Sequence, residues 1–371
     1  KQSSGIKIHL LVEQIIFMKK NLIVALLLMV NAWANAQSKK QMALAVDAIM
    51  NNYAAADMPG ASVLVLKNNK IVFKKGYGLS NINTKEAIKP TTNFRLASVT
   101  KQFTAMSVLL LDQQQKLSIE DPISKYFSLL PAYISKIKIK DLLTHSSGLI
   151  DYEDLMPSTQ KIQLHDTNCL QLLFLADSLY FPAGTQYKYS NTGYAILALI
   201  VEQVSGKSFA QFLKENIFKP LHMKTTVAFE EGKSVVANRA YGNSFENGSW
   251  TQTDQSLTSA VLGDGGIYTN VVEYTKWIKA LLSYRFIDQA LQERAWSRTK
   301  LENGKIIDYG YGWHVEEFEN NTHPFHDGSS IGFRNSVGLF PDQKLMVIVL
   351  TNRNEHDPIE EVHKIAALYL K

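Results

Sequence analysis

The chain has 371 residues, of which 46% are hydrophobic and 20% are charged, and its formal net charge is +5. Residues 1–36 hold four lysines and one glutamate, so they carry +3 of that charge and the rest of the chain only +2. A body this close to neutral gives no electrostatic reason to bind nucleic acid, and its apolar content argues against disorder. The single cysteine, Cys169, excludes an internal disulfide, and the histidines show no HExxH or paired zinc spacing. We therefore expect no metal and no other cofactor.

The N-terminal segment has the pattern of an export signal. Two lysines precede an apolar run at 22–30, and the small residues 34–36 follow it as a cleavage site. Nine apolar residues are too few to cross a bilayer, which needs about 20. We expect an over-extended start at 1–17 and a signal peptide at 18–36. The mature protein would then be periplasmic or secreted, without a stable membrane anchor.

The next elements are predicted from periodicity and turn residues. Apolar positions at helical spacing predict a helix within 39–55, and 61–67 and 70–78 read as two strands joined by a tight turn at Asn68-Asn69. A long middle region is mostly helical. Its predicted helices are 98–115, 139–144, 168–176, 192–205, 208–217, 271–283 and 287–296.

The C-terminal part returns to strands. Residues 335–340 and 344–352 predict a second hairpin, and 357–370 predict a final helix. Strands from both ends would share one antiparallel sheet, so we expect an α+β fold with a large helical region inserted. The sheet would take about 40–95 and 305–371, and the helices about 96–304, within a single unit, 37–371. The seam between sheet and helices is the expected place for a site.

The first candidate motif is Ser98-Val99-Thr100-Lys101, which opens the long helix predicted at 98–115. A serine hydroxyl needs a base, and a lysine three residues on lies on the same helical face. The same spacing also occurs at Ser4, Ser135, Ser158 and Ser297. Only the first motif sits in a helix that is apolar nearly all round, where a lone lysine would be buried. A lysine reaching out to water from the helix end is the alternative.

Two further motifs follow. Tyr189 and Asn191 lie just before the helix predicted at 192–205. A phenol beside a Ser–Lys pair can pass protons, because nearby cations lower its pKa. The amide of Asn191 can bind substrate. The alternative is that Asn191 only caps the helix. His326-Asp327-Gly328 is the only His-x-Gly in the chain, and Gly328 with Ser329 would let backbone approach a ligand. The alternative is a turn with a surface histidine.

Taken in order, SVTK, YSN and HDG resemble the three active-site elements of the serine β-lactamase and DD-peptidase superfamily. The similarity is greatest to class C β-lactamases and their DD-carboxypeptidase, D-aminopeptidase and esterase relatives. Other stretches agree and extend the resemblance over about 40–371: DLLTHSSGLIDY, FPAGTQYKYSNTGY, GDGGIYTN, YGYGW and HDGSSIGF.

The resemblance implies a β-lactamase-like fold and an acyl-enzyme mechanism. Ser98 would be the nucleophile, Lys101 the motif lysine and Tyr189 the general base. Asn191, His326, Gly328 and Ser329 would bind substrate, and the N–H groups of Ser98 and Ser329 would form the oxyanion hole.

One departure bears on the substrate. Dedicated class C β-lactamases carry Lys-Thr-Gly where this chain has His-Asp-Gly. A histidine is mostly neutral above its reference pKa of about 6.5, so it would bind acidic substrates weakly unless Asp327 raises that pKa. Arg334 is a candidate for the missing charge. We expect a hydrolase of amides or esters, with D-alanyl or D-amino-acid peptides, including peptidoglycan, as substrates. The alternatives are a broad esterase, a weak β-lactamase, or an inactive peptidoglycan-binding module.

Overall fold

The structure is a computed structural model that describes residues 18–21, 37 and 39–370. The expected start at 1–17 and most of the expected signal peptide lie outside the described residues. The chain divides into two compact units at Asn51, and residues 39–49 form a helix within the first. Everything that follows concerns the second unit, which begins at Asn52.

A six-stranded antiparallel sheet forms the centre of this unit, and it joins strands from both ends of the chain as predicted. Its order is β12-β13-β14-β15-β1-β2, with Ala61 of β1 opposite Thr351 of β15. The strands are β1 (Ala61–Lys67), β2 (Lys70–Tyr77), β12 (His314–Phe318), β13 (Asn321–Ser330), β14 (Phe333–Phe340) and β15 (Leu345–Thr351). Two of its inner strands, β15 and β1, are almost entirely buried because both of their faces are apolar.

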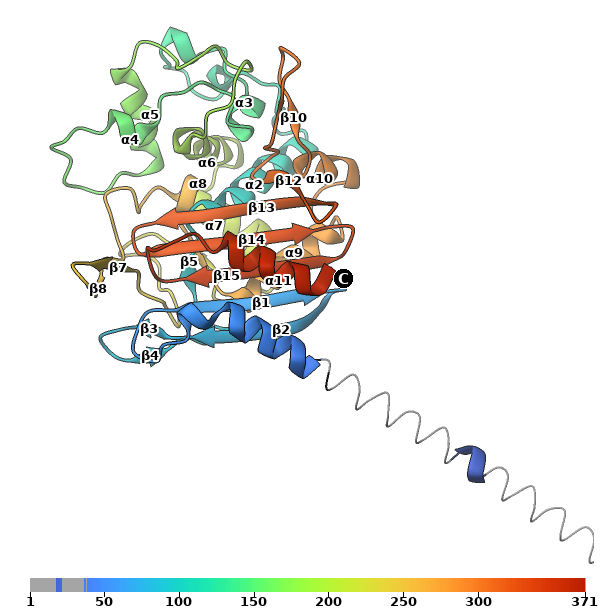
Figure 1. Ribbon diagram of the computed structural model, residues 1–371. Helices are drawn as coiled ribbons and strands as arrows, with labels where there is room; N and C mark the ends of the chain where they lie inside the picture. The colour runs from blue at the N-terminus through green and yellow to red at the C-terminus, as the bar shows by residue number, and fades with distance from the viewer. Residues whose placement is uncertain (1–17, 22–36, 38, 371) are drawn as a thin grey trace, which may run out of the picture. The chain divides into compact units, whose positions relative to one another are not determined.

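Helices cover both faces of this sheet (Figure 1). The C-terminal helix α11 (Ile359–Leu370) packs on β14 and β15 from one side. On the other side, α9 (Val271–Leu282) packs on β1 and β15, and the 3-10 turn η2 (Ala97–Thr100) packs on β13 and β14. The α+β class is therefore confirmed, and alternate residues of β13 face two different environments.

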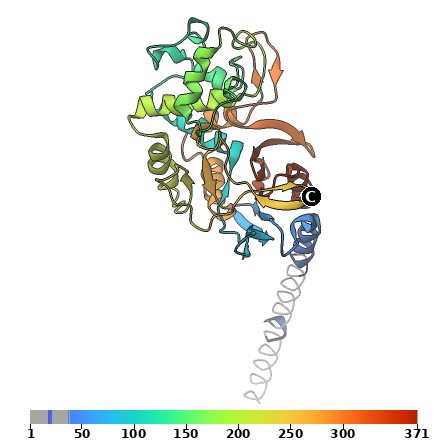
Figure 2. The same ribbon diagram turned by 90° about the vertical axis from the view of Figure 1, so that its left-hand side faces the viewer.

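The inserted region is mostly helical, and its part from 139 to 205 lies beyond β13, on the side of the sheet away from β2, in both views (Figures 1 and 2). Its other helices are α2 (Lys101–Gln113), α3 (Ile139–Leu143), α4 (Tyr152–Leu155), α5 (Asp166–Leu172), α6 (Asn191–Ser205), α7 (Phe209–Leu213), α8 (Leu262–Gly265) and α10 (Gln289–Ala295). The remaining short turns of this region are η3 (Ile123–Lys125), η4 (Ala132–Ile134), η5 (Leu173–Leu175) and the π-helical η6 (Lys214–Phe218); a further turn, η1 (Asn51–Tyr53), precedes β1.

Four small sheets were not predicted, because most of their strands have only two or three residues and show no periodicity. They are β3 (Leu79–Asn81) with β4 (Glu86–Ala87), β5 (Phe94–Arg95) with β9 (Ile267–Thr269) and β6 (Val227–Ala228), β7 (Asn243–Glu246) with β8 (Ser249–Gln252), and β10 (Thr299–Lys300) with β11 (Ile306–Ile307). The β5-β9-β6 sheet matters most for the site, because β5 leads directly into η2.

Within the described part of the chain, no single helix is long and apolar enough to cross a membrane. Among the described residues, one pair of helices, α6 with residues 209–218, reaches the necessary length and composition together, and that pair is bent by 75°. Ten residues of α6 are buried.

Candidate active site

Ser98 lies in a strained turn just before the long buried helix. The sequence predicted a helix from Ser98, but α2 begins at Lys101 and Ser98 belongs to the 3-10 turn η2. Ala97 has φ +49°, a left-handed conformation that non-glycine residues rarely adopt. Such strain is held in place only by surrounding structure and is common where a side chain must be presented to a ligand.

The Lys101 amine is the centre of the polar contacts. Its Nζ donates to Ser98 Oγ at 3.0 Å, to Asn191 Oδ1 at 2.9 Å and to the Asp264 carbonyl at 3.0 Å. The residue is fully buried, so the alternative of a lysine that reaches to water is wrong. Burial lowers the pKa of Lys101, and the Asp264 carboxylate opposes this shift. The amine therefore loses its proton more readily than a surface lysine and can then accept one from Ser98.

Asn191 links this amine to two acidic side chains. It is the first residue of α6, and the helix cap is Ser190, whose hydroxyl accepts from Gly193 N–H, so Asn191 is not the N-cap. Its Nδ2 donates to Glu153 Oε1 at 3.2 Å, and its backbone N–H donates to Asp151 Oδ2 at 2.6 Å. The amide is thus held with its oxygen toward Lys101.

The pKa of Tyr189 is shifted upward, whereas the sequence suggested that nearby cations would lower it. The side chain is fully buried, and burial raises its pKa well above the usual value, with the Ser98 hydroxyl opposing this only in part. Lys101 Nζ lies 4.9 Å from the centre of the ring. The phenol oxygen is buried and interacts with the Ser98 hydroxyl, but it forms no hydrogen bond of good geometry to any described residue. In this state the phenol is a protonated donor, and Lys101 is the better base.

His326 is a buried neutral residue that does not line the pocket. Its Nε2 pairs with the Tyr309 hydroxyl at 3.0 Å and its Nδ1 with the Asp327 carbonyl at 2.6 Å, while the Asp327 carboxylate accepts from Ser336. Burial lowers the pKa of His326 well below its ordinary value. Asp327 therefore does not make it a cation, and the surface-histidine alternative is also wrong.

Gly328 has a structural role, which is to allow close packing between two segments of the chain. A Cβ at this position would lie 2.1 Å from the carbonyl oxygen of Leu96, so only glycine lets β13 approach the segment that carries Ser98. Neither Gly328 nor His326 is among the pocket residues, although both were predicted to bind substrate. Ser329 does line the pocket.

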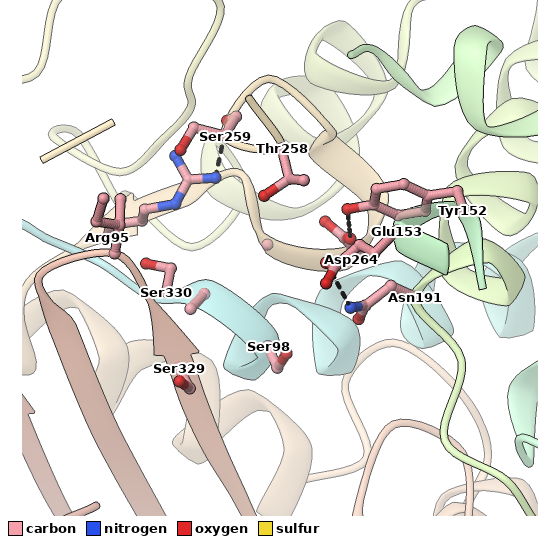
Figure 3. A pocket seen from close by; sticks show the side chains of 13 residues that line it. Arg95, Ser98, Tyr152, Glu153, Asn191, Thr258, Ser259, Asp264, Ser329 and Ser330 are labelled. Atoms are coloured by element: carbon pink, nitrogen blue, oxygen red, sulfur yellow. Dashed lines mark hydrogen bonds between the residues drawn. The ribbon is translucent and has the colours of Figure 1, made fainter. Parts of the chain in front are cut away.

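A polar cavity of about 200 Å³ opens beside Ser98. In Figure 3, Arg95 and Ser330 lie on one side of Ser98, and Tyr152, Glu153, Asn191 and Asp264 on the other. Its lining is Arg95, Ala97, Ser98, Tyr152, Glu153, Asn191, Thr258, Ser259, Asp264, Gly265, Ser329, Ser330 and Ile331. The cavity therefore has a cationic side and a carboxylate side.

Arg95 is the functional candidate that the sequence did not reveal. The residue is 2% exposed, and its Nη2 donates to the Ser259 carbonyl at 2.8 Å. Its Nε and Nη1 are buried and lack a partner in the part of the chain that the structure describes. Arg334, the cation suggested by the sequence, instead binds the Ser330 and Phe333 carbonyls and lies 3.5 Å from Asp357. A two-residue strand gives no pattern from which Arg95 could have been found.

The chain is similar in sequence to known proteins. The family model described as Beta-lactamase matches residues 46–370. Penicillin-binding protein 4* of Bacillus subtilis (strain 168) is 29% identical over 324 residues, covering 83% of this chain and 71% of that protein. Protein flp of Staphylococcus aureus (strain MRSA252) is 28% identical over 80% of this chain, which spans only 60% of that relative's length.

The fold also matches a solved enzyme structure. D-amino acid amidase from Ochrobactrum anthropi SV3, complexed with L-phenylalanine amide, superposes with a TM-score of 0.76. The match covers 88% of this chain and 98% of that one, at 22% identity. At this identity the likeness concerns the fold alone.

Proposed function

The chain belongs to the beta-lactamase family, and from this premise we propose that it is a serine hydrolase that cleaves amide or ester bonds through an acyl-enzyme on Ser98. The observation that carries the proposal is the 3.0 Å contact between the fully buried Lys101 Nζ and Ser98 Oγ. Burial favours the neutral amine, and a neutral amine next to a serine hydroxyl is an activated nucleophile.

The reaction follows from these contacts. Neutral Lys101 takes the Ser98 proton as Oγ attacks the substrate carbonyl, and backbone N–H groups of Ser98 and Ser329 would stabilise the resulting oxyanion. The proton then passes to the leaving amine or alcohol, and the protonated Tyr189 phenol can donate along this path. Water attacks the acyl-enzyme in the second half-reaction, with the same groups in reverse order.

We propose amino-acid derivatives, among them D-alanyl peptides and D-amino-acid amides, as the substrates. Arg95 on one side of the cavity can pair with a carboxylate, and Glu153 on the other can pair with an ammonium group. A plain ester would use neither contact, which argues against a broad esterase. The names of the similar proteins, penicillin-binding protein and D-amino acid amidase, support substrates of the D-configuration.

Two alternative functions, a β-lactamase and an inactive peptidoglycan-binding module, fit the site less well. The neutral His326 leaves the His-x-Gly element without the lysine charge of dedicated lactamases, which favours slow lactam turnover. An inactive peptidoglycan-binding module would not need the contact between Lys101 and Ser98. We further propose that the mature protein acts in the periplasm or outside the cell, on the basis of the signal pattern at 18–36.

Covalent labelling tests the proposal. A fluorophosphonate or a fluorescent penicillin should label the wild-type protein at Ser98, and Ser98→Ala should abolish labelling and lower turnover by several orders of magnitude. Ser135→Ala and Ser297→Ala, at two of the other Ser-x-x-Lys positions, are matched controls that should label normally. Full labelling of Ser98→Ala would refute the assignment.

A substrate panel tests the finer proposal. Nitrocefin, a D-Ala-D-Ala peptide, a D-amino-acid amide and a short-chain ester should be compared under one condition. We expect the amino-acid substrates to be turned over fastest and nitrocefin slowly. Nitrocefin hydrolysis that exceeds all other members of the panel would contradict the substrate assignment without affecting the role of Ser98.

A further inference from the structure

Three ligating side chains meet on the face of the sheet that α11 covers, away from the Ser98 cavity. Glu316 comes from β12, His323 from β13 and His363 from α11. The two Nε2 atoms are 3.1 Å apart, and His363 Nε2 lies 3.4 Å from Glu316 Oε1. One ligand atom from each residue lies within 4.8 Å of the others. Segments far apart in the sequence thus converge with two imidazoles and a carboxylate.

These separations suit a small divalent ion. Zinc binds histidine nitrogen and carboxylate oxygen at about 2.0–2.2 Å, so neighbouring ligand atoms in a tetrahedral site lie about 3.3 Å apart. The two separations in the structure, 3.1 and 3.4 Å, fall on either side of that value. Glu316 is partly exposed, with 40% of its side chain accessible, so it can turn to close the third edge.

His323 Nε2 pairs with His363 Nε2, so an ion that binds between the two rings would replace the proton they share. His323 Nδ1 lies 3.2 Å from the Leu339 carbonyl, which can only accept, so Nδ1 carries the proton and Nε2 has a lone pair. Metal-binding histidines usually donate their second nitrogen to a carbonyl or carboxylate in this way.

Packing holds both rings in position. Phe340 stacks on His323 with a centroid separation of 4.3 Å and an interplanar angle of 7°, and Phe318 stacks on His363 at 4.3 Å and 16°. A Cβ on Gly338 would lie 2.6 Å from His323 Cε1, so glycine leaves the space that this ring occupies. Rings that are fixed before binding lose little entropy when a ligand arrives.

We propose that Glu316, His323 and His363 bind a divalent transition-metal ion of the zinc type, with water as the fourth ligand. The side chains of His363 and Glu316 are 24% and 40% exposed, which gives the ion and the water access from solvent. The ion would connect α11 to β12 and β13, and so would stabilise the folded state in proportion to its occupancy. Its role is structural, and it takes no part in the chemistry at Ser98. Neither its success nor its failure depends on the proposed hydrolase activity.

Zinc titration of the untagged full chain tests this site. After chelator treatment, we expect one Zn²⁺ per chain, a rise in Tm on adding Zn²⁺, and the visible absorption of tetrahedral Co²⁺ when cobalt replaces zinc. His363→Gln and Glu316→Gln, both partly exposed, should fold and should bind Zn²⁺ more weakly by at least the factor of about 10–100 that loss of an outer-shell partner costs. His222→Asn is the matched control, because His222 is exposed and its φ of +54° suits asparagine.

Labelling of Ser98 with a fluorophosphonate separates this site from zinc bound in the catalytic cavity. Zn²⁺ at one equivalent should leave the labelling rate unchanged in wild type and in His363→Gln. Three results would overturn the proposal: no Zn²⁺ binding by the wild type, equal affinity in wild type and both ligand variants, or binding that persists in His363→Gln and blocks labelling.

Discussion

The hairpin of β13 and β14 has two faces with opposite characters. On the face toward η2, His326 pairs with the Tyr309 hydroxyl, and Gly328 lets β13 approach the segment that carries Ser98. On the face toward α11, His323 pairs with His363, and Gly338 leaves space for the His323 ring. Both faces use a buried histidine and a glycine that makes room for a close contact. Because side chains alternate along a strand, histidines three residues apart reach different sites.

The two faces differ in how completely their polar groups are satisfied. Next to the cavity, the described residues leave Arg95 Nε and Nη1, Tyr189 Oη and Ser330 Oγ buried without a hydrogen bond of good geometry. Both nitrogens of His323, on the other face, have a partner. Unpaired buried polar groups cost stability, so they persist mainly where a ligand uses them. The unpaired donors next to the cavity are groups that a substrate could use, whereas an ion on the α11 face would replace the existing contact between His323 and His363.

The sharpest test of this contrast is Lys101→Arg. Arginine keeps the positive charge but stays protonated at any working pH, so it cannot take the Ser98 proton. We expect acylation to fall by about 10²–10⁴-fold, the usual contribution of a general base. Stopped-flow or gel-based labelling rates would measure it, with the exposed Lys116→Arg as control. Near-normal acylation would mean that Lys101 acts only as a fixed charge.

A pair of glycine substitutions compares the two faces directly. Gly328→Ala puts a Cβ against the carbonyl oxygen of Leu96. Because this oxygen belongs to the backbone, the clash can be relieved only by a shift of the chain that leads into η2. We therefore expect labelling of Ser98 to fall sharply. Gly338→Ala meets mainly the His323 ring and the Val362 side chain. It should weaken zinc binding and leave labelling nearly intact. Each change should also destabilise the fold by about 1–3 kcal/mol, as overpacking does.

Thermal melts, labelling of Ser98 and zinc binding should be measured for both glycine variants. If both variants lose labelling and zinc binding to the same extent, the hairpin behaves as one cooperative element. The separation of its faces into two sites would then be wrong.

The sequence predicted the large elements because their patterns are strong. The Asn68-Asn69 turn adopts positive φ at both residues, as expected for a tight hairpin. The apolar helix after Ser98 correctly predicted a buried Lys101. Where the prediction failed, the cause was tertiary: burial, and not a neighbouring cation, dominates the pKa of Tyr189, and His326 turns toward Tyr309. Arg95 and the His323–His363 pair depend on contacts between distant segments that no local spacing reveals.

A smaller effect, on selectivity, is expected for Arg95→Gln. If the free guanidinium nitrogens pair with a substrate carboxylate, the loss should be about 1.5–3 kcal/mol, or roughly 10- to 160-fold in kcat/KM, for acidic substrates only. A neutral amide or ester should be hydrolysed almost normally. The sequence had suggested Arg334 as the cation that meets acidic substrates. Arg334→Gln tests that assignment and should leave the selectivity for acidic substrates unchanged. An acid-selective loss in Arg334→Gln, and none in Arg95→Gln, would reverse the assignment.

The smallest expected effect is a shift in the pH profile of Asp264→Asn. Activity on a neutral substrate should rise with pH as Lys101 loses its proton, and because burial lowers the pKa of this lysine, the rise should occur below the usual lysine range. The Asp264 carboxylate favours the charged amine and so raises that pKa; without it the rising limb should move to lower pH. The Asp264 carbonyl that accepts from Lys101 Nζ remains in the variant, and asparagine keeps an acceptor for the Tyr152 hydroxyl. Acylation rates across pH in wild type and variant measure the shift. A rising limb that moves to higher pH, or does not move, would show that the titrating group is not Lys101.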